Sequence, residues 1–100
     1  MIQKKTMLTA IFRIKNHLGI HARPAAKLAK LAQSFCSEVN LIKANRQADV
    51  KSVLDILSLG CGFNDEVALV INGKDEKKAF NAILDLIETE IGERINGTQI

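Results

Sequence analysis

The hydrophobic pattern of this 100-residue chain changes its period near Gly19, and that change determines where a strand gives way to a helix. Residues 7–14, MLTAIFRI, have the composition of a β-strand, with partial alternation of apolar and polar residues. After the loop at residues 16–19, apolar residues recur at helical spacing, while Lys27 and Lys30 fall on the opposite side. The apolar stripe consists of Ala25, Leu28, Ala29, Ala32 and Phe35. The sequence therefore predicts a strand, a loop and an amphipathic helix with small residues on its buried face.

The rest of the chain continues with alternating strand and helix signals. Strands are predicted at residues 38–43 and 66–71, with a weaker one at 47–50 after a tight turn. Ser52 and Asp75 are predicted N-caps of two further helices, the first of which ends at Gly60.

The order of these elements, βαββαβα, predicts an α+β open-faced sandwich. In it, a four-stranded antiparallel sheet carries three helices on one face. We expect one domain over residues 1–100, with its core at about 7–90 and a short N-terminal extension. The residues from Gly92 onward lose their period and are predicted to form a frayed tail.

Composition excludes several classes of protein. The net charge is only +3, there is no dense run of Lys and Arg, and Trp and Tyr are absent, so no nucleic acid partner is expected. No apolar run approaches the ~18 residues of a membrane span, and the N-terminus lacks a signal-peptide pattern. Cys36 and Cys61 are isolated, without metal-site or disulfide spacing. We therefore expect a cytoplasmic protein that does not insert into membranes.

A histidine and an arginine stand at the predicted start of the first helix. Gly19 precedes it, His21 falls near the N-cap, and Pro24 falls in the first turn, where its missing N–H costs nothing. The free amides of a first turn carry about half a positive charge and commonly bind anions. The neutral imidazole of His21 is a nucleophile, and Arg23 would supply a forked donor to phosphate oxygens. The arrangement indicates a histidine that accepts a phosphoryl group.

Two other interpretations concern the same residues. His21 could cap the helix or fill a surface notch, and the spacing alone does not decide between this role and phosphoryl transfer. His17 and His21 are four apart, as in a helical pair of metal ligands, but Gly19 breaks that geometry. No carboxylate or cysteine lies nearby in the sequence, so no metal site is predicted.

Ser52 is the second candidate site. A serine at a helix N-cap has a structural role, because its hydroxyl accepts a hydrogen bond from a free amide, and spacing alone favours that role. The same hydroxyl is favourably placed for phosphorylation, since the helix start and Lys51 would stabilise the phosphate. Such a phosphate would add negative charge beside the apolar Val53, Leu54 and Leu57.

Together, the two sites make the sequence similar to a known family. LGIHARPAAKLAKLA, residues 18–32, resembles the active-site signature of the HPr family, the histidine-containing phosphocarriers of the bacterial phosphotransferase system. VKSVLDILSLG, residues 50–60, resembles the regulatory-serine segment of that family. The correspondence runs from about Met7 to Glu90 and includes the separation between the two motifs.

The resemblance implies an open-faced β-sandwich that carries phosphoryl groups without a cofactor. Such a protein takes the group from phosphorylated enzyme I, which phosphoenolpyruvate charges, and passes it to a histidine of an enzyme IIA component in sugar uptake. By motif match, His21 would carry the group on Nδ1 and Arg23 would stabilise it. Ser52 would be the target of an ATP-dependent HPr kinase/phosphorylase, in bacteria that have one. The chain would act as a phosphocarrier rather than a stand-alone enzyme. Since transfer needs only transient contact with each partner, we expect a monomer.

The resemblance also implies a surface that docks partner proteins. The helix after Ser52 carries more apolar residues than so short a helix can easily bury, which suits an exposed patch that binds proteins. Basic residues around it would attract acidic partners. The implied surface consists of Ile20, Lys30, Lys51, Val53, Leu54 and Leu57.

Two alternatives stay open. A regulatory, nitrogen-type phosphocarrier would signal without transporting sugar; NHLGIHARP, residues 16–24, is close to a branch that includes such carriers, whereas Lys51–Ser52 favours the sugar type. A signalling module would act through Ser52 alone, but such a module has no need of the His21–Pro24 motif.

Overall fold

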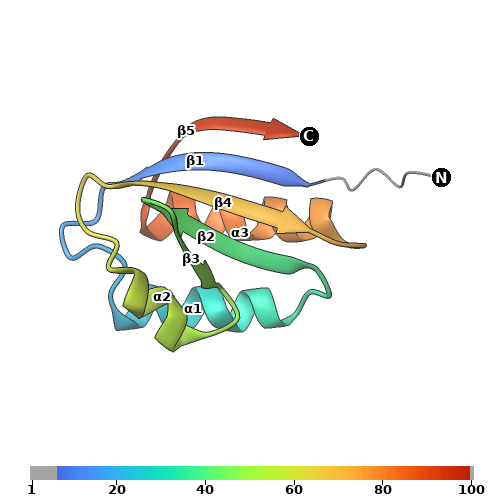
Figure 1. Cartoon of the computed structure of the whole chain (residues 1–100), viewed down its shortest axis with the longest axis horizontal. Coiled ribbons are helices and arrows are strands. Elements are labelled where there is room, and N and C mark those ends of the chain that lie inside the picture. Colours follow the sequence, from blue (N-terminus) through green and yellow to red (C-terminus); the bar gives the residue numbers. More distant parts are fainter. Residues whose placement is uncertain (1–6, 100) are drawn as a thin grey trace.

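The computed structural model describes residues 7–99, so the expected N-terminal extension lies outside the described residues. The strands form one antiparallel sheet in the order β3-β2-β4-β1-β5, and the three helices cover one face of it (Figure 1). The elements are β1 (Leu8–Ile14), α1 (Ala22–Gln33), β2 (Glu38–Lys43), β3 (Arg46–Asp49), α2 (Val53–Leu59), β4 (Glu66–Asn72), α3 (Glu76–Glu90) and β5 (Gly92–Gln99). The predicted open-faced α+β sandwich with three helices is confirmed.

The core lies between the sheet and the helices. Side chains of β1 and β4 alternate between buried and half-buried, because successive residues of a strand face opposite sides of a sheet. Helix α1 contributes mostly small residues, which let it lie close to the strands. The buried side chains include Ala10, Phe12, Ile14, Val67, Leu69 and Ile71 from the sheet, and Ala25, Leu28, Ala29 and Ala32 from α1.

The sheet has a fifth strand, β5, where a frayed tail was predicted. It pairs antiparallel with β1 from Leu8 opposite Gln99 to Ile14 opposite Gly92, with one irregularity between Ile11 and Phe12. These residues show little alternation of their own, and the free edge of β1 supplies the backbone partners that order them. The predictions of a frayed tail and of a sheet with only four strands were wrong, because a local pattern does not record an open edge elsewhere.

The first hairpin and the start of α3 also differ in detail from the prediction. Strand β3 begins one residue earlier than predicted, after a turn in which Ala44 and Asn45 have φ values of 48° and 66°. Asp75 occupies the N-cap position of α3, but its carboxylate makes no capping bond. It accepts instead from the backbone amides of Cys36 and Ser37, at 2.9 and 3.0 Å, and so ties the connection between α1 and β2 to the start of α3.

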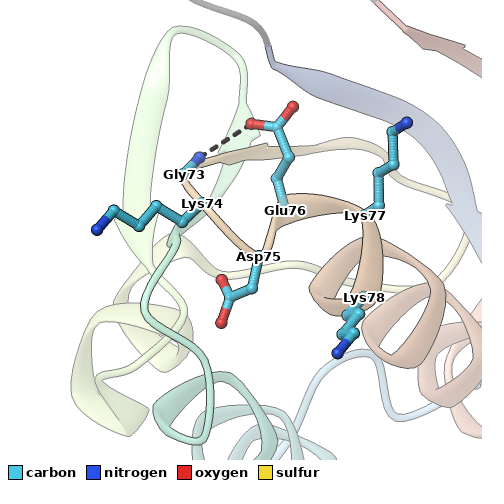
Figure 2. Close-up of a pocket in the computed structure, with 6 residues that line it drawn as sticks. All are labelled: Gly73, Lys74, Asp75, Glu76, Lys77 and Lys78. Atoms are coloured by element: carbon cyan, nitrogen blue, oxygen red, sulfur yellow. Dashed lines mark hydrogen bonds between the residues drawn. The ribbon is translucent and has the colours of Figure 1, made fainter.

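The Glu76 side chain binds a backbone amide just before α3, which the Asp75 side chain does not do. Its Oε1 accepts from the backbone amide of Gly73 at 3.0 Å, inside the hollow at the start of α3 (Figure 2). Both carboxylates that line this hollow therefore accept hydrogen bonds from backbone amides and have a structural role. The hollow follows the end of β4 that pairs with Leu8, so it lies at the opposite end of the sheet from Ile14 and the loop that follows it.

Candidate functional site

The loop before α1 is fastened to the segment that follows α2. The backbone amide of Ile20 donates to the carbonyl oxygen of Cys61 at 3.0 Å. Gly19 has a φ of 68°, and a Cβ atom there would lie 2.3 Å from the same oxygen, so only glycine allows this approach. Asn16 accepts from the Leu18 amide through its side chain at 3.0 Å, and from the Gly19 amide through its carbonyl at 2.9 Å. These bonds fix the chain immediately before the histidine.

His21 is the N-cap residue of α1, as predicted. Its backbone is extended, its carbonyl accepts from the Ala25 amide at 3.0 Å, and its side chain makes no capping bond. The alternative in which the imidazole caps the helix is therefore not what the structure shows. Since Pro24 has no N–H, the amides of Ala22 and Arg23 are the donors that this helix start leaves without helical partners. The imidazole is partly exposed, so a negative group on it would lie near these donors.

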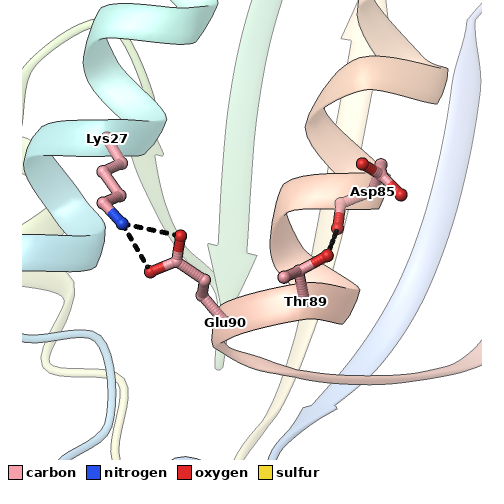
Figure 3. A network of polar contacts seen from close by, with 4 residues as sticks. All are labelled: Lys27, Asp85, Thr89 and Glu90. Carbon is pink, nitrogen blue, oxygen red and sulfur yellow. Dashed lines mark hydrogen bonds and ion pairs between the residues drawn. The ribbon is translucent and has the colours of Figure 1, made fainter.

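Arg23 is exposed and lies one turn before Lys27 on α1. Lys27 Nζ donates to both carboxylate oxygens of Glu90, at 3.0 and 2.8 Å, which joins α1 to the end of α3 (Figure 3). Exposed ion pairs of this kind contribute only about 0–1 kcal/mol. In the part of the chain that the structure describes, Arg23 itself makes no ion pair, so its guanidinium is available to an incoming anion.

Ser52 caps α2, as predicted. Its Oγ accepts from the backbone amide of Asp55 at 3.2 Å, and the hydroxyl is partly exposed. The Asp55 carboxylate in turn accepts from the Asp49 amide at 3.2 Å, which ties α2 to the end of β3. The hydroxyl thus has a structural role already, and it remains at the surface.

The two candidate phosphorylation sites lie at opposite ends of α1. Lys51 Nζ donates to the carbonyl oxygen of Phe35 at 2.8 Å, and the Gln33 side chain donates to the Lys51 carbonyl at 2.8 Å. Ser52 therefore lies beside the C-terminal end of α1, whereas His21 begins that helix. The 12 residues of α1 span ~18 Å, so the two side chains do not form one site.

Exposed apolar side chains lie on α2 and on the two loops joined by the Ile20–Cys61 bond. Leu54 and Leu57 of α2 are 76% and 38% exposed. Leu18 and Phe63, which the sequence analysis missed, are 74% and 47% exposed, and the Phe63 ring stacks on His17 with centroids 4.5 Å apart. The signal available in the sequence was an apolar residue next to a glycine in each loop, Leu18 before Gly19 and Phe63 after Gly62. Such residues are often exposed, because a loop has no buried face of its own.

The other residues of the implied docking surface differ in their accessibility. Lys30 is exposed and Val53 is packed partly against the core. Lys51 has its ammonium bound to the end of α1, and Ile20 is only 5% exposed and belongs to the core. The structure therefore does not place the Ile20 side chain on that surface.

The thiol nearest to this loop does not compete with His21 as a nucleophile. Burial raises the pKa of Cys61 to about 11, although the positive charge of Lys43 opposes the shift. The group therefore stays a protonated thiol near neutral pH, and the reactive form of a cysteine is the thiolate. Among residues 7–99, no three His, Cys, Asp or Glu side chains gather in a way that would hold a metal ion.

Comparison with known proteins agrees with this architecture. Residues 8–89 match the family described as the HPr component phosphorylation site of the phosphotransferase system. The phosphocarrier protein HPr of Cupriavidus necator is 41% identical over 87 residues, which cover 87% of this chain and 98% of that protein. A histidine-containing phosphocarrier protein from Mycoplasma has a similar structure, with a TM-score of 0.81 at 29% identity, covering 85% of this chain and 98% of the other.

A larger protein also contains a related segment. The phosphoryl donor subunit DhaM of the PEP-dependent dihydroxyacetone kinase of Providencia stuartii is 37% identical over 91 residues. The match covers 91% of this chain but 19% of that protein.

The fold and these similarities define a small phosphocarrier domain of the open-faced sandwich type. The chain belongs to the HPr family of the phosphotransferase system, as its two motifs predicted. Members of this family work with enzymes of that system, such as enzyme I and enzyme IIA components. Within the described residues, no helix combines the length and apolar character needed to cross a membrane.

Proposed function

We propose that this protein accepts a phosphoryl group on His21 from phosphorylated enzyme I and passes it to a histidine of an enzyme IIA component. The observation that supports this most strongly is the placement of His21. Its imidazole is partly exposed, stands at the start of a 12-residue helix and makes no capping hydrogen bond. We place the protein in the cytoplasm as a monomer and in the service of sugar uptake.

The transfer needs only one bond to form and one to break in each direction. The electron pair of His21 Nδ1 attacks the phosphorus atom of the donor phosphohistidine, and the donor N–P bond breaks with its electrons returning to the donor nitrogen. Arg23 and the free amides of the first turn bind the phosphoryl oxygens in the product. Delivery to the acceptor histidine reverses these roles, and no cofactor takes part.

Docking would use the exposed apolar side chains beside the site. Leu54 and Leu57 present apolar area, and exposed Lys30 and Arg23 add positive charge that attracts acidic partners. Charges at the rim of such a surface mainly raise the rate of encounter, whereas central apolar contacts slow dissociation. Transfer needs only transient contact, so a small surface would suit partners that must exchange quickly.

Phosphorylation of Ser52 by an ATP-dependent HPr kinase/phosphorylase would regulate the transfer. Since His21 begins α1 and Ser52 lies beside the other end of that helix, the phosphate would act by changing the surface of α2 rather than by touching the imidazole. Lys51 precedes the serine, but its ammonium is already bound to the Phe35 carbonyl, so it would have to be released to pair with the phosphate.

Two other carriers use the same chemistry. The similarity to DhaM favours a donor role in a branch other than sugar uptake. A regulatory, nitrogen-type phosphocarrier would signal through its phosphorylation state alone. Both require His21, and the identity of the acceptor protein distinguishes them from sugar transport.

The test is phosphoryl transfer to the purified protein. It is incubated with phosphoenolpyruvate and enzyme I of the same source, and ³¹P NMR follows an acid-labile histidine phosphate. The wild-type protein and His17→Ala are expected to give the signal, and His21→Ala to lose it. Absence of the signal in the wild type, with enzyme I active on a known carrier, would contradict the proposal and leave a module that acts through Ser52.

A further inference from the structure

The loop that precedes His21 is hydrogen-bonded at its start to the junction between α3 and β5. The carbonyl oxygen of Ile91 accepts from the backbone amides of both Lys15 and Asn16, at 2.9 and 3.0 Å. Ile91 is itself only 2% exposed, and its amide donates to the Ile87 carbonyl at 2.8 Å. One carbonyl therefore fixes the two residues with which the loop begins.

The bonds of Asn16 carry this constraint toward His21. Its side chain accepts from the Leu18 amide, and its carbonyl oxygen accepts from the Gly19 amide. Gly19 and Ile20 then rest against Cys61, immediately before the histidine. A displacement of Asn16 would remove the acceptors on which this turn is built.

Gly92 lets the junction approach β1 closely enough to make these bonds. A Cβ atom on this residue would lie 2.0 Å from the carbonyl oxygen of Arg13 and 3.0 Å from the Cα of Ile14. Both neighbours are backbone atoms, which cannot move aside as the end of a flexible side chain can. From Gly92 onward, β5 pairs along β1 and so anchors the junction from its other side.

We propose that the segment Ile91–Gly92, the junction between α3 and β5, positions the phosphoacceptor loop, with the Ile91 carbonyl as the point of attachment and Gly92 as the residue that permits it. This inference rests on the proposed function of His21. It goes beyond that function because the segment follows residue 89, the last residue of the family match. Ile91 and Gly92 are positioning residues and take no part in the chemistry.

The test compares Gly92→Ala with Ile95→Ala. An alanine at position 92 must push β5 and the Ile91 carbonyl away from β1. Ile95 falls at the irregularity between the pairs Ile11–Asn96 and Phe12–Arg94, and its side chain is 48% exposed, so its truncation should leave the junction in place. The two readouts are amide hydrogen exchange at Lys15 and Asn16, and the kcat and KM of phosphorylation by enzyme I.

In Gly92→Ala we expect the two amides to exchange roughly tenfold faster or more. The value of kcat should fall by about tenfold, since small misplacements of a reacting group have effects of this size or larger. KM should stay unchanged, because the docking residues of α1 and α2 are untouched. Ile95→Ala should match the wild type in every readout.

Three results would contradict either the positioning role of Ile91 and Gly92 or the proposed function of His21. Unchanged amide exchange in Gly92→Ala, or faster exchange with a wild-type kcat, overturns the positioning role. A wild-type protein that takes up no phosphate overturns the proposed function, whatever its amides do. If Gly92→Ala fails to fold, native-state exchange of the wild type decides, because the proposal requires the Lys15 and Asn16 amides to open together with those of β5; independent opening overturns it.

Discussion

Gly19 and Cys61 meet backbone to backbone: the Cys61 carbonyl oxygen lies 2.3 Å from where a Cβ atom on Gly19 would stand. Gly60, the residue directly before Cys61, has the same φ of 68°, yet a Cβ there would meet nothing within 4 Å. Substituting each glycine therefore distinguishes two energetic costs. At Gly60 only the left-handed backbone is strained, whereas at Gly19 the close contact with the Cys61 carbonyl is lost as well.

We predict that Gly60→Ala lowers the free energy of unfolding by about 1–2 kcal/mol, the cost of a left-handed conformation for a residue with a Cβ. Gly19→Ala should cost more, because the Cys61 carbonyl must also move. Urea unfolding of both variants measures the difference. Equal losses would mean that the contact between Gly19 and Cys61 has no energetic weight.

The Asp75 carboxylate makes stability depend on pH. Its pKa is lowered from the ordinary 3.8, chiefly by the hydrogen bond from the Ser37 hydroxyl and then by that from the Cys36 amide. A carboxyl whose pKa is lower in the folded state stabilises the protein above its unfolded pKa, and the contribution is lost as the pH falls through the folded pKa. We therefore expect Asp75→Asn to be destabilising near neutral pH, by an amount that shrinks below about pH 4.

Unfolding in urea at a series of pH values tests this expectation. Asp85→Asn, which removes an exposed carboxylate elsewhere on α3, is the control. Asp65, whose pKa is also lowered, chiefly by the Gly62 amide, is present in all three proteins, so its contribution cancels. A deficit of Asp75→Asn that stays constant from neutral to acidic pH would show that the bonds matter but the charge does not.

Arg23 and Lys30 should affect different steps of the phosphoryl transfer. Arg23→Ala removes hydrogen bonds to charged oxygens and should lower kcat by roughly tenfold to a hundredfold. Lys30→Ala removes a charge at the rim and should raise KM, more so at low salt, with kcat retained. Steady-state phosphorylation by enzyme I separates the two effects. A pure KM effect of Arg23→Ala would place Arg23 in docking rather than at the phosphate.

Ser52 should tolerate aspartate better than alanine. Ser52→Ala removes the acceptor of the Asp55 amide and should cost about 1 kcal/mol of stability. Ser52→Asp keeps an oxygen at the N-cap and should unfold at nearly the wild-type urea concentration, because the two residues are similarly good caps. If both variants lose the same stability, the hydroxyl is held by something other than the capping bond.

Leu54 should bind partners without supporting the fold. It is 76% exposed, so Leu54→Ser should leave the unfolding midpoint unchanged while raising KM toward enzyme I by roughly fivefold. Ile95→Ser changes another exposed apolar residue, on β5, and should leave KM unaltered. Equal effects of the two substitutions would argue against a docking surface on α2.

Features governed by neighbours in the chain were predictable from the sequence. The start of α1 at His21–Pro24 and the cap at Ser52 follow from residue types within one helical turn. Strand β1 and strand β4 follow from alternation, since one face is buried and the other is not.

Features that depend on distant partners were not predictable. Strand β5 exists because β1 offers an open edge, and the Asp75 carboxylate binds Cys36 and Ser37 from another connection. Ile20 lies in a loop, where no period shows which side chains turn inward. The sequence therefore predicted the helix starts at His21 and Ser52, but not the contacts that the far end of the chain makes with the loop before His21.

The pairing of β1 with β5 also determines how this domain can be joined to others. Because Leu8 lies opposite Gln99, both ends of the described chain leave from one end of the sheet, while the loop that carries His21 leaves from the other (Figure 1). The seven residues of β1 put ~20 Å between them. A neighbouring domain, a tether or a purification tag attached beyond either of these ends would thus lie away from His21, so the geometry of the domain suits a module within a longer polypeptide.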